Sequence, residues 1–435
     1  MKTMKERKID SKTLNLFRNI AKVLSPPPEL TVSQWADKYR KLSPESSSEP
    51  GQWNTDRAPY QREIMDAVVD SAVETVVIMS SAQVGKTELI LNTIGYYIDY
   101  DPAPILCLQP TLEMAQAFSK DRLAKMIRDT PVLRGKVKDA RARDSENTIL
   151  HKSFPGGHIT MVGANSAAGL AMRPIRIVMM DEIDRFPPSA GSEGNPIKLA
   201  EKRTTTFWNR KKIKVSTPTI KGRSQIETEY LSSSKEEWCV PCPCCGKYQP
   251  YEWGRIRISD VTMECKYCGE HFKETEWKER PGKWIAGAEN KRKRGFHLNE
   301  LASPWKHWEE IIEDFREAYR EWKENGDIQK LKVWVNTSLG ETWEEKGDAA
   351  DEDVLLKRRE RYTADLPDGV LLVTAGVDVQ DDRFEVEITG WGKGYESWGI
   401  LYRKIPGDLE KEQTWEKLEK FLEMELYFEN KNSLL

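Results

Sequence analysis

The stretch MSSAQVGKTELI, residues 79–90, contains the Gly-Lys-Thr that ends a phosphate-binding loop. In such a loop, backbone N–H groups at the start of a helix face the phosphates of a nucleotide, and a lysine adds positive charge. A side chain at Gly85 would crowd the phosphate, Lys86 would reach the β- and γ-phosphates, and Thr87 would hold Mg²⁺. Such a loop usually begins with glycine, whereas this one begins with Ser80. Gly-Lys-Thr alone therefore also fits a plain strand–helix turn. The predicted nucleotide-binding residues of the loop are Ser80, Ser81, Ala82, Gln83, Val84, Gly85, Lys86 and Thr87.

Short apolar runs alternate with helical stretches on both sides of this loop. Between residues 58 and 224 the runs are TVVIMSS, APILCLQP, HITMVGAN, IRIVMMDE and KIKVSTP. Apolar runs of this length, separated by helices, predict buried strands of a mostly parallel sheet that helices cover. The pattern therefore predicts an α/β fold, a P-loop NTPase sheet with the loop after its first strand.

An acidic pair, Asp181-Glu182, closes the fourth of these apolar runs. An aspartate at the end of a strand beside the loop can bind Mg²⁺, and the adjacent glutamate can position the attacking water. Acidic residues at a helix start are also common, because they favour the helix dipole. Since both motifs occur in the expected order, each after an apolar run, we expect an ATPase in which Lys86 and Glu182 are catalytic and ATP and Mg²⁺ are bound.

Two weaker signals accompany these motifs. Gln61, upstream of the first strand, could read the adenine edge, although it is equally well a surface residue of an amphipathic helix. Ser216 and Thr217 end the fifth apolar run, where they could sense the γ-phosphate and couple its state to movement. A strand that simply ends before Pro218 explains them equally well.

Six of the seven cysteines lie between Cys239 and Cys268. Two Cys-x2-Cys pairs, each followed by glycine, have the spacing of a tetrahedral four-thiolate zinc site. We predict structural Zn²⁺ there. The ligands are Cys242, Cys245, Cys265 and Cys268, while Cys239 and Cys244 are surplus and His271 is a weaker candidate.

The composition limits the class of protein without defining it. The chain has 435 residues, which suggests two to three domains, and a formal net charge of -3, so any nucleic-acid surface must be local. No apolar run is long enough to span a bilayer, and the N-terminus has no apolar core for a signal peptide. We expect a cytosolic protein with no membrane contact.

The chain divides into five predicted segments. Residues 1–50 form an N-terminal arm, 51–237 the P-loop ATPase domain, 238–272 an inserted zinc ribbon and 273–364 a helical linker region. Residues 365–435 predict three consecutive antiparallel strands and a helix.

Several unusual segments, taken together and in order, resemble a known family. They include SSAQVGKTE, GANSAAGLAMRPIRIVMMDEIDRFP, STPTIKGRS, CPCCG…CKYCG and DGVLLVTAGVDVQDDRFEVEITGWG. From about Leu30 to Gly407 the chain resembles the large subunit of tailed-phage terminases of the lambda GpA type. Serine at the position of Ser80 is normal in such terminases, so the resemblance favours a genuine nucleotide site.

The resemblance implies an ATP-driven motor that packages double-stranded phage DNA, with an RNase H-like endonuclease. It implies that Gly85, Lys86 and Thr87 belong to the phosphate loop, and that Asp181 and Glu182 are the Mg²⁺-binding aspartate and the catalytic glutamate. It also implies a coupling role for Ser216 and Thr217. It also implies that Asp378 is the first metal-binding aspartate of the nuclease, which would use Mg²⁺ or Mn²⁺. The implied partners are the small terminase subunit, with the N-terminal arm as its implied contact, and the portal of the procapsid, on which a ring assembles in the host bacterium's cytoplasm.

The match to an RNase H-like domain is partial. Such a site needs carboxylates from more than one strand, and a second is expected from a strand that would follow the last helix. Asp381 and Asp382 lie in the same turn as Asp378 and are poor substitutes. We therefore expect a truncated RNase H-like domain that does not cut DNA efficiently, with an unpaired strand edge and an open apolar face.

Two other classes of protein fit parts of the pattern. A helicase or DNA translocase with a zinc ribbon would use the same loop, although no second motor domain with helicase-type arginine motifs is recognised. A non-catalytic, zinc-ribbon DNA-binding scaffold with a degenerate loop is the second alternative. ATP turnover by the wild type and its loss in Lys86 and Glu182 variants separate these alternatives.

Overall fold

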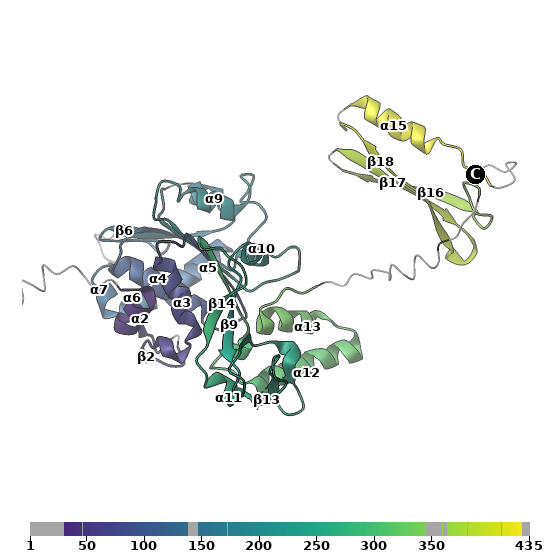
Figure 1. Cartoon of the computed structure of the whole chain (residues 1–435). Coiled ribbons are helices and arrows are strands. Elements are labelled where there is room, and N and C mark those ends of the chain that lie inside the picture. The colour runs from purple at the N-terminus through teal and green to yellow at the C-terminus, as the bar shows by residue number, and fades with distance from the viewer. Residues whose placement is uncertain are drawn as a thin grey trace, which may run out of the picture. The chain divides into compact units, whose positions relative to one another are not determined.

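The computed structural model describes most of the chain, in two compact units that we treat separately (Figure 1). The described residues are 30–45, 47–137, 147–171, 173–344, 359, 363–380, 382–409 and 411–428. The first unit spans Met1–Glu345 and the second Lys346–Leu435. No helix of the described ranges has both the length and the apolar character that crossing a membrane requires.

A ten-stranded mixed sheet forms the centre of the first unit, in the order β10-β9-β15-β3-β8-β7-β4-β6-β5, with β14 paired to β9. The five predicted strands are present and parallel to one another, while β5 (His151–Phe154) pairs antiparallel with β6. They are β3 (Thr75–Ser80), β4 (Pro104–Gln109), β6 (Gly157–Gly163), β7 (Ile177–Asp181) and β8 (Lys211–Ser216). The α/β fold with a large parallel sheet is therefore confirmed.

Helices cover both faces of this sheet and bury two separate cores (Figure 1). Side chains alternate along β3, so Val76 and Ile78 belong to one core and Val77 and Met79 to the other. The first face carries α3 (Tyr60–Val69), α4 (Lys86–Asp99), α5 (Leu112–Ala117), the π-helix η2 (Phe118–Leu123), α6 (Ala124–Asp129) and α7 (Pro131–Arg134). The second carries α8 (Ala167–Ala171), α9 (Pro196–Lys202) and α10 (Gln225–Leu231).

The predicted N-terminal arm is partly wrong, because its second half packs against the core of the first unit. The helix α2 (Val32–Tyr39) starts at Thr31 with a capping box and buries Trp35 completely. A Cβ atom at Gly95 of α4 would lie 2.3 Å from the Trp35 ring, so glycine permits this close contact. The short strands β1 (Lys41–Leu42) and β2 (Gly51–Gln52) pair antiparallel beside it. Residues 1–29 of the predicted arm lie outside the described residues.

The predicted helical linker over 273–364 also needs correction. Two of its segments, β14 (Lys283–Ala286) and β15 (Lys293–Leu298), are strands of the central sheet, and β15 pairs parallel with β3. The basic start of β15 concealed it, since Arg294 is satisfied by ion pairs to Glu63 and Glu236 rather than by water alone. Among the described residues of this range the helices are α11 (Glu274–Lys278), η5 (Glu300–Ala302), α12 (Trp308–Asn325), α13 (Gln329–Trp334) and η6 (Val335–Leu339). Residues 345–358 and 360–362 lie outside the described residues.

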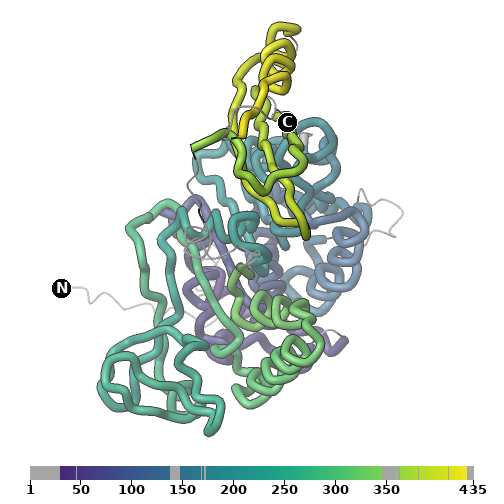
Figure 2. The backbone as a smooth tube through the Cα atoms, turned by 90° about the vertical axis from the view of Figure 1, so that its right-hand side faces the viewer, coloured from purple at the N-terminus to yellow at the C-terminus, as the bar shows by residue number. Residues whose placement is uncertain are grey.

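The cysteine-bearing segment projects from the β9 edge of the sheet as a small module (Figure 2). The strand β9 (Glu236–Pro241) continues from the sheet into it and pairs with β10 (Tyr248–Pro250). A second, three-stranded sheet contains β11 (Ile256–Arg257), β12 (Thr262–Glu264) and β13 (His271–Lys273). The module shares one buried core with α12 and α13, in which Trp277 and Trp308 are fully buried.

The second unit has the three antiparallel strands and the helix that the sequence predicts. These are β16 (Leu372–Val379), β17 (Arg383–Trp391), β18 (Ser397–Pro406) and α15 (Glu412–Leu422). Phe384 and Val386 of the central strand are fully buried, and Leu418 and Phe421 of α15 complete this core. Within the described residues β16 pairs on one side only, with β17, so the predicted unpaired edge is present there.

Candidate active site

The loop between β3 and α4 has the backbone that the glycine pattern predicts. Gly85 caps α4 with φ +91°, and a Cβ atom there would lie 2.1 Å from Nε2 of Gln61. Gln83 also has a positive φ of 57° without being glycine. Left-handed backbone at a non-glycine residue costs free energy and collects at functional sites, where the surrounding structure enforces it.

Segments far away in the sequence form hydrogen bonds with this loop. Nε2 of Gln61 donates to the carbonyl of Val84 at 3.1 Å. The N–H of Ser81 donates to Leu298 O at 2.9 Å, and that of Ala82 to Thr337 O at 2.7 Å. In the described part of the chain, no backbone carbonyl accepts from the N–H groups of residues 83–86. Those N–H groups are therefore free to bind an anion at the N-terminus of α4.

The acidic pair lies within reach of the loop lysine. Nζ of Lys86 is 3.6 Å from Oε1 of Glu182, and it also donates to the hydroxyl of Thr217. Burial lowers the pKa of Lys86, against the opposing charges of Glu182 and Asp181. Glu182 adopts φ +55°, and its buried Oε2 accepts no hydrogen bond from the described residues. That oxygen lies 3.6 Å from Nε of Arg185, an ion-pair contact without a hydrogen bond. A strained carboxylate with this spare hydrogen-bonding capacity fits a residue that positions a water molecule.

Asp181 ends β7 in a largely buried position. Burial raises its pKa to about 6, although a hydrogen bond of 3.1 Å from Nε2 of Gln109 and the charge of Lys86 lower it. Burial of this carboxylate without a cation costs free energy, which a bound Mg²⁺ would recover. The donor set of the Asp181 carboxylate and the Thr87 hydroxyl suits Mg²⁺, which prefers oxygen ligands.

The strand β8 lies between β3 and β7 and brings the predicted coupling residues between the two motifs. The hydroxyl of Ser216 accepts from the N–H of Asp184 at 3.2 Å, beside the acidic pair. Thr217 binds the loop lysine, as described above. Ser216 and Thr217 thus connect the segment after β7 with the loop after β3.

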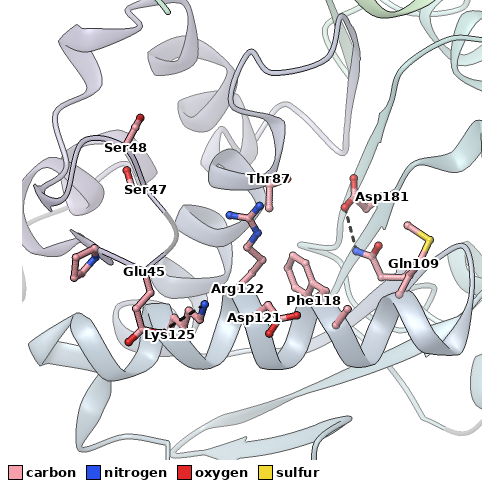
Figure 3. A pocket seen from close by; sticks show the side chains of 13 residues that line it. Glu45, Ser47, Ser48, Thr87, Gln109, Phe118, Asp121, Arg122, Lys125 and Asp181 are labelled. Carbon is pink, nitrogen blue, oxygen red and sulfur yellow. Dashed lines mark hydrogen bonds and ion pairs between the residues drawn. The ribbon is translucent and has the colours of Figure 1, made fainter. Parts of the chain in front are cut away.

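An open cavity of about 710 Å³ adjoins these strand ends (Figure 3). Its wall includes Thr87 at the start of α4, Asp181 and Gln109 at strand ends, and one face of the helical segment that contains Arg122. The loop from Pro44 to Ser48 lines the opposite side, where Ser46 itself is not described. A volume of this size accommodates a nucleoside triphosphate. Gln61 is fully buried beneath the loop and does not line this cavity, so its adenine contact stays a prediction.

The four predicted zinc ligands lie together at the tip of the cysteine-bearing module. All four sulfur atoms are within 4.8 Å of one another. The Cys242–Cys268 and Cys245–Cys265 pairs are each 3.7 Å apart, close to the separation of about 3.8 Å expected around tetrahedral zinc. The N–H of Tyr267 points to the sulfur of Cys265 at 3.4 Å, as a zinc knuckle requires. A four-sulfur site that fits Zn²⁺ is therefore present, and Cys239, Cys244 and His271 are not part of it.

In the second unit, Asp378 lies on β16 directly opposite Glu385 of β17. Both side chains line a pocket of about 360 Å³ with Glu387 and Tyr402. Hydrogen bonds from Tyr402 and Arg383, with help from Lys404, lower the pKa of Glu385 to about 2. Two carboxylates of β17, Glu385 and Glu387, thus lie beside Asp378, whereas the expectation that the second metal ligand comes from a later strand stays a prediction. Asp382 does not line this pocket, and Asp381 is outside the described residues.

Sequence reasoning missed several residues of these sites. Gln109, Leu298 and Thr337 reach the loop or the acidic pair from distant parts of the chain, and no motif marks them. Glu385 did carry a signal, since a tight turn between β16 and β17 fixes which residues face each other.

The fold and the cavity define a mixed α/β protein with a ligand site at the carboxyl ends of a parallel sheet. Comparison with known families identifies the family more closely. Residues 47–284 match the model "Phage terminase large subunit gpA, ATPase domain", and residues 293–435 match "Terminase large subunit gpA, endonuclease domain". The chain belongs to this family of phage terminase large subunits.

Individual relatives agree with the family. The chain is 32% identical over 421 residues to the terminase large subunit of Enterobacteria phage P21, covering 89% of this chain and 64% of that protein. It is 31% identical over 443 residues to the large subunit of Escherichia phage lambda, covering 93% of this chain and 68% of that protein. The chain therefore spans about two thirds of the length of these relatives.

Solved structures give weaker similarities. The large terminase of bacteriophage HK97 matches with a TM-score of 0.46 and 12% identity, covering 90% of this chain and 71% of that one. The ATPase domain of the Thermus phage P74-26 large terminase matches with a TM-score of 0.37 and 14% identity, covering 66% of this chain and 96% of that one.

Proposed function

We propose that the chain is an ATP-driven motor that packages viral DNA, with a P-loop ATPase in the first unit. The observation that supports this best is the convergence of three neighbouring strand ends. The loop lysine after β3 contacts both Glu182, which follows β7, and Thr217, which follows β8. The neighbouring Thr87 and Asp181 line one cavity. Membership of the terminase family supports the same activity.

Each residue has a distinct role in this proposal. The free N–H groups of residues 83–86 and Lys86 bind the β- and γ-phosphates of ATP, while Thr87 and Asp181 hold Mg²⁺. The bound Mg²⁺ neutralises charge on the phosphates. Glu182 orients the attacking water, and the loss of its pairing with Lys86 on nucleotide binding frees the carboxylate to do so. Ser216 and Thr217 report the state of the γ-phosphate to the segment after β7.

The other bound ions follow from the donor sets. The four-sulfur site binds structural Zn²⁺, because four thiolates leave no open coordination position for catalysis. The second unit is an RNase H-like nuclease whose pocket takes Mg²⁺ or Mn²⁺ through Asp378. Arg383 and Lys404 compete with a metal ion for Glu385, so we expect DNA cleavage by this chain to be weak.

The proposed partners are those of a packaging machine. They are double-stranded phage DNA, the small terminase subunit through the N-terminal arm, and the portal of the procapsid, on which a ring assembles. The work would take place in the cytoplasm of the bacterial host.

ATP turnover with and without double-stranded DNA tests the proposal. We expect DNA-stimulated hydrolysis by the wild type, and a loss of at least about 100-fold in Lys86→Ala and in Glu182→Gln. Glu182→Gln should still bind ATP, whereas Lys86→Ala should bind it weakly. Wild-type protein that binds DNA but hydrolyses no ATP, even with procapsids present, would support the DNA-binding scaffold instead. Strand separation coupled to hydrolysis would support a helicase.

A further inference from the structure

A second cavity, of about 240 Å³, lies where the cysteine-bearing module joins the central sheet. Aromatic and acidic side chains line it, among them Glu237, Trp238, Trp253, Asn299 and Glu341. We propose that this second cavity binds the guanidinium group of an arginine that a partner polypeptide presents. It shares no lining residue with the cavity beside the phosphate loop, so the inference does not depend on the proposed ATPase.

The charge of the second cavity is negative and largely uncompensated. Glu237 and Glu341 are exposed to solvent, and neither forms an ion pair with another described residue. Of the described residues that line the cavity, none is Lys or Arg, and the nearby Arg255 and Lys266 pair with the third carboxylate, Glu252. Partial burial raises the pKa of Glu237 and of Glu341, and the charge of Glu252 adds to the shift at Glu237. Like charges without a counter-ion favour a bound cation and repel the phosphates of DNA, which makes a polypeptide the fitting partner.

The ligand that fits is an extended cation rather than a metal ion. Within the ranges that the structure describes, the four cysteines are the one set of three or more His, Cys, Asp or Glu groups close enough to share an ion. The carboxylates of the second cavity therefore do not converge on one point. Burial lowers the pKa of His297, so this lining residue adds no positive charge at neutral pH. The volume is below the range of about 300–1,000 Å³ that is typical of small-molecule sites, and it suits one long side chain.

Two half-buried tryptophans form walls that are in place before a ligand binds. Trp238 packs edge-on against Tyr60 and Trp284, with ring centroids 6.1 and 5.5 Å away. Trp253 packs in the same way against Trp334, at 4.6 Å. A planar guanidinium stacks on such rings, and cation–π attraction is strongest for tryptophan. Walls that are already ordered lower the entropic cost of binding.

Asn299 supplies a hydrogen-bond acceptor beside these walls. It is 9% exposed and lines the second cavity. Its Nδ2 donates to the carbonyl of Tyr251 at 2.6 Å, which fixes the amide, while its Oδ1 accepts no hydrogen bond from the described residues. A guanidinium carries N–H donors along two edges and so can bind a carboxylate and the amide oxygen while its face lies on an aromatic ring. The compact ammonium of lysine cannot make the same combination of contacts.

Tripeptide probes test this assignment on the full-length chain. Saturation-transfer NMR would compare the affinity of acetyl-Gly-Arg-Gly-amide with that of the same peptide containing citrulline, the neutral isostere of arginine. We expect the arginine peptide to bind at least about 10-fold more tightly, because the ion pairs and the cation–π attraction are lost together in citrulline. Glu237→Gln combined with Glu341→Gln should remove most of this difference. Glu289→Gln, at an exposed glutamate outside the cavity, is the matched control and should behave as the wild type.

Each other outcome of this experiment is decisive. Equal affinities of the wild type for the arginine and citrulline peptides, or no binding of either, overturn the assignment. Equal binding of a lysine tripeptide overturns the preference for a guanidinium. A double-stranded oligonucleotide that displaces the arginine peptide would make the cavity a DNA contact and overturns the assignment as well. Circular dichroism identifies a variant that does not fold, and the two peptides on the wild type then decide the question. No readout involves ATP, so failure here is distinct from failure of the proposed function.

Discussion

Substituting Gly85 by alanine should destabilise the first unit by two separable effects. The first is conformational, because φ at Gly85 is +91°, a region that L-residues rarely adopt. The second is steric, because the added Cβ atom would lie 2.1 Å from Nε2 of Gln61. Gln61 cannot keep its place, so its buried amide loses the 3.1 Å hydrogen bond to the carbonyl of Val84.

The two effects have estimable magnitudes. A left-handed backbone costs an alanine about 1–2 kcal/mol relative to glycine. A buried donor and acceptor left without each other cost roughly 1–3 kcal/mol more. We therefore expect Gly85→Ala to lower the free energy of unfolding by about 2–5 kcal/mol, summing these two ranges.

The chain offers a matched control. Gly194 has nearly the same φ, +97°, and nothing within 4 Å of an added Cβ, so Gly194→Ala should show the conformational cost alone. Urea unfolding followed by tryptophan fluorescence, with midpoints compared at constant m, measures both variants. In a Gln61→Ala background the steric cost disappears, so Gly85→Ala should then cost no more than Gly194→Ala. Equal costs of the two glycine variants in the wild-type background would refute the argument from the Gln61 contact.

Four further predictions concern the ions and charges of the chain. Zinc analysis should find one Zn²⁺ per chain, and Cys245→Ser or a strong chelator should remove it and lower the melting temperature; an unchanged melting temperature would contradict a structural role. Lys214 is 2% exposed and lies 2.7 Å from both Glu201 and Glu229, so Lys214→Met should cost about 3–5 kcal/mol in urea unfolding. Burial raises the pKa of Glu229, but the larger opposing effect of Lys214 and Lys293 brings it down from 4.5 to about 2. The contribution of Glu229 to the free energy of unfolding is therefore present above pH 4.5 and is lost as the pH falls toward 2. Glu229→Gln should make the free energy of unfolding less dependent on pH in this acid range. Plasmid nicking with Mn²⁺ should be weak and should vanish in Asp378→Asn but not in Asp382→Asn, and strong nicking would contradict the competition for Glu385.

The fold of the first unit was predictable where strands are fully buried. Apolar runs such as TVVIMSS have no polar face and can only be central strands of a sheet covered on both sides. β15 escaped prediction because its first residues are Lys293 and Arg294, whose charges are neutralised by Glu229, Glu63 and Glu236. Ion pairs to residues far away in the sequence leave no local pattern. A strand that depends on them cannot be recognised from its own residues.

The residues of the candidate active site also include some that the sequence predicts and some that it does not. Lys86, the acidic pair and Ser216 were predictable because parallel strands bring their carboxyl ends to one edge, whatever lies between them in the sequence. Arg122 lines the cavity from η2, which follows β4 by a full helix. Side-chain direction over such a distance depends on packing, which periodicity does not specify.

The segment η6 (Val335–Leu339) lies between the loop that joins β3 to α4 and the cysteine-bearing module. Trp334 at the end of α13 packs against Trp253 of the module, with ring centroids 4.6 Å apart. Three residues further on, Thr337 accepts from the N–H of Ala82 in the loop, and a Cβ atom at Gly340 would lie 2.6 Å from the nitrogen of Ser81. Because the module, α12 and α13 share one buried core, a displacement of the module must either shift η6 or break these contacts. The cysteine-bearing module is thus packed, through α13 and η6, against the segment that holds the loop that we propose binds ATP.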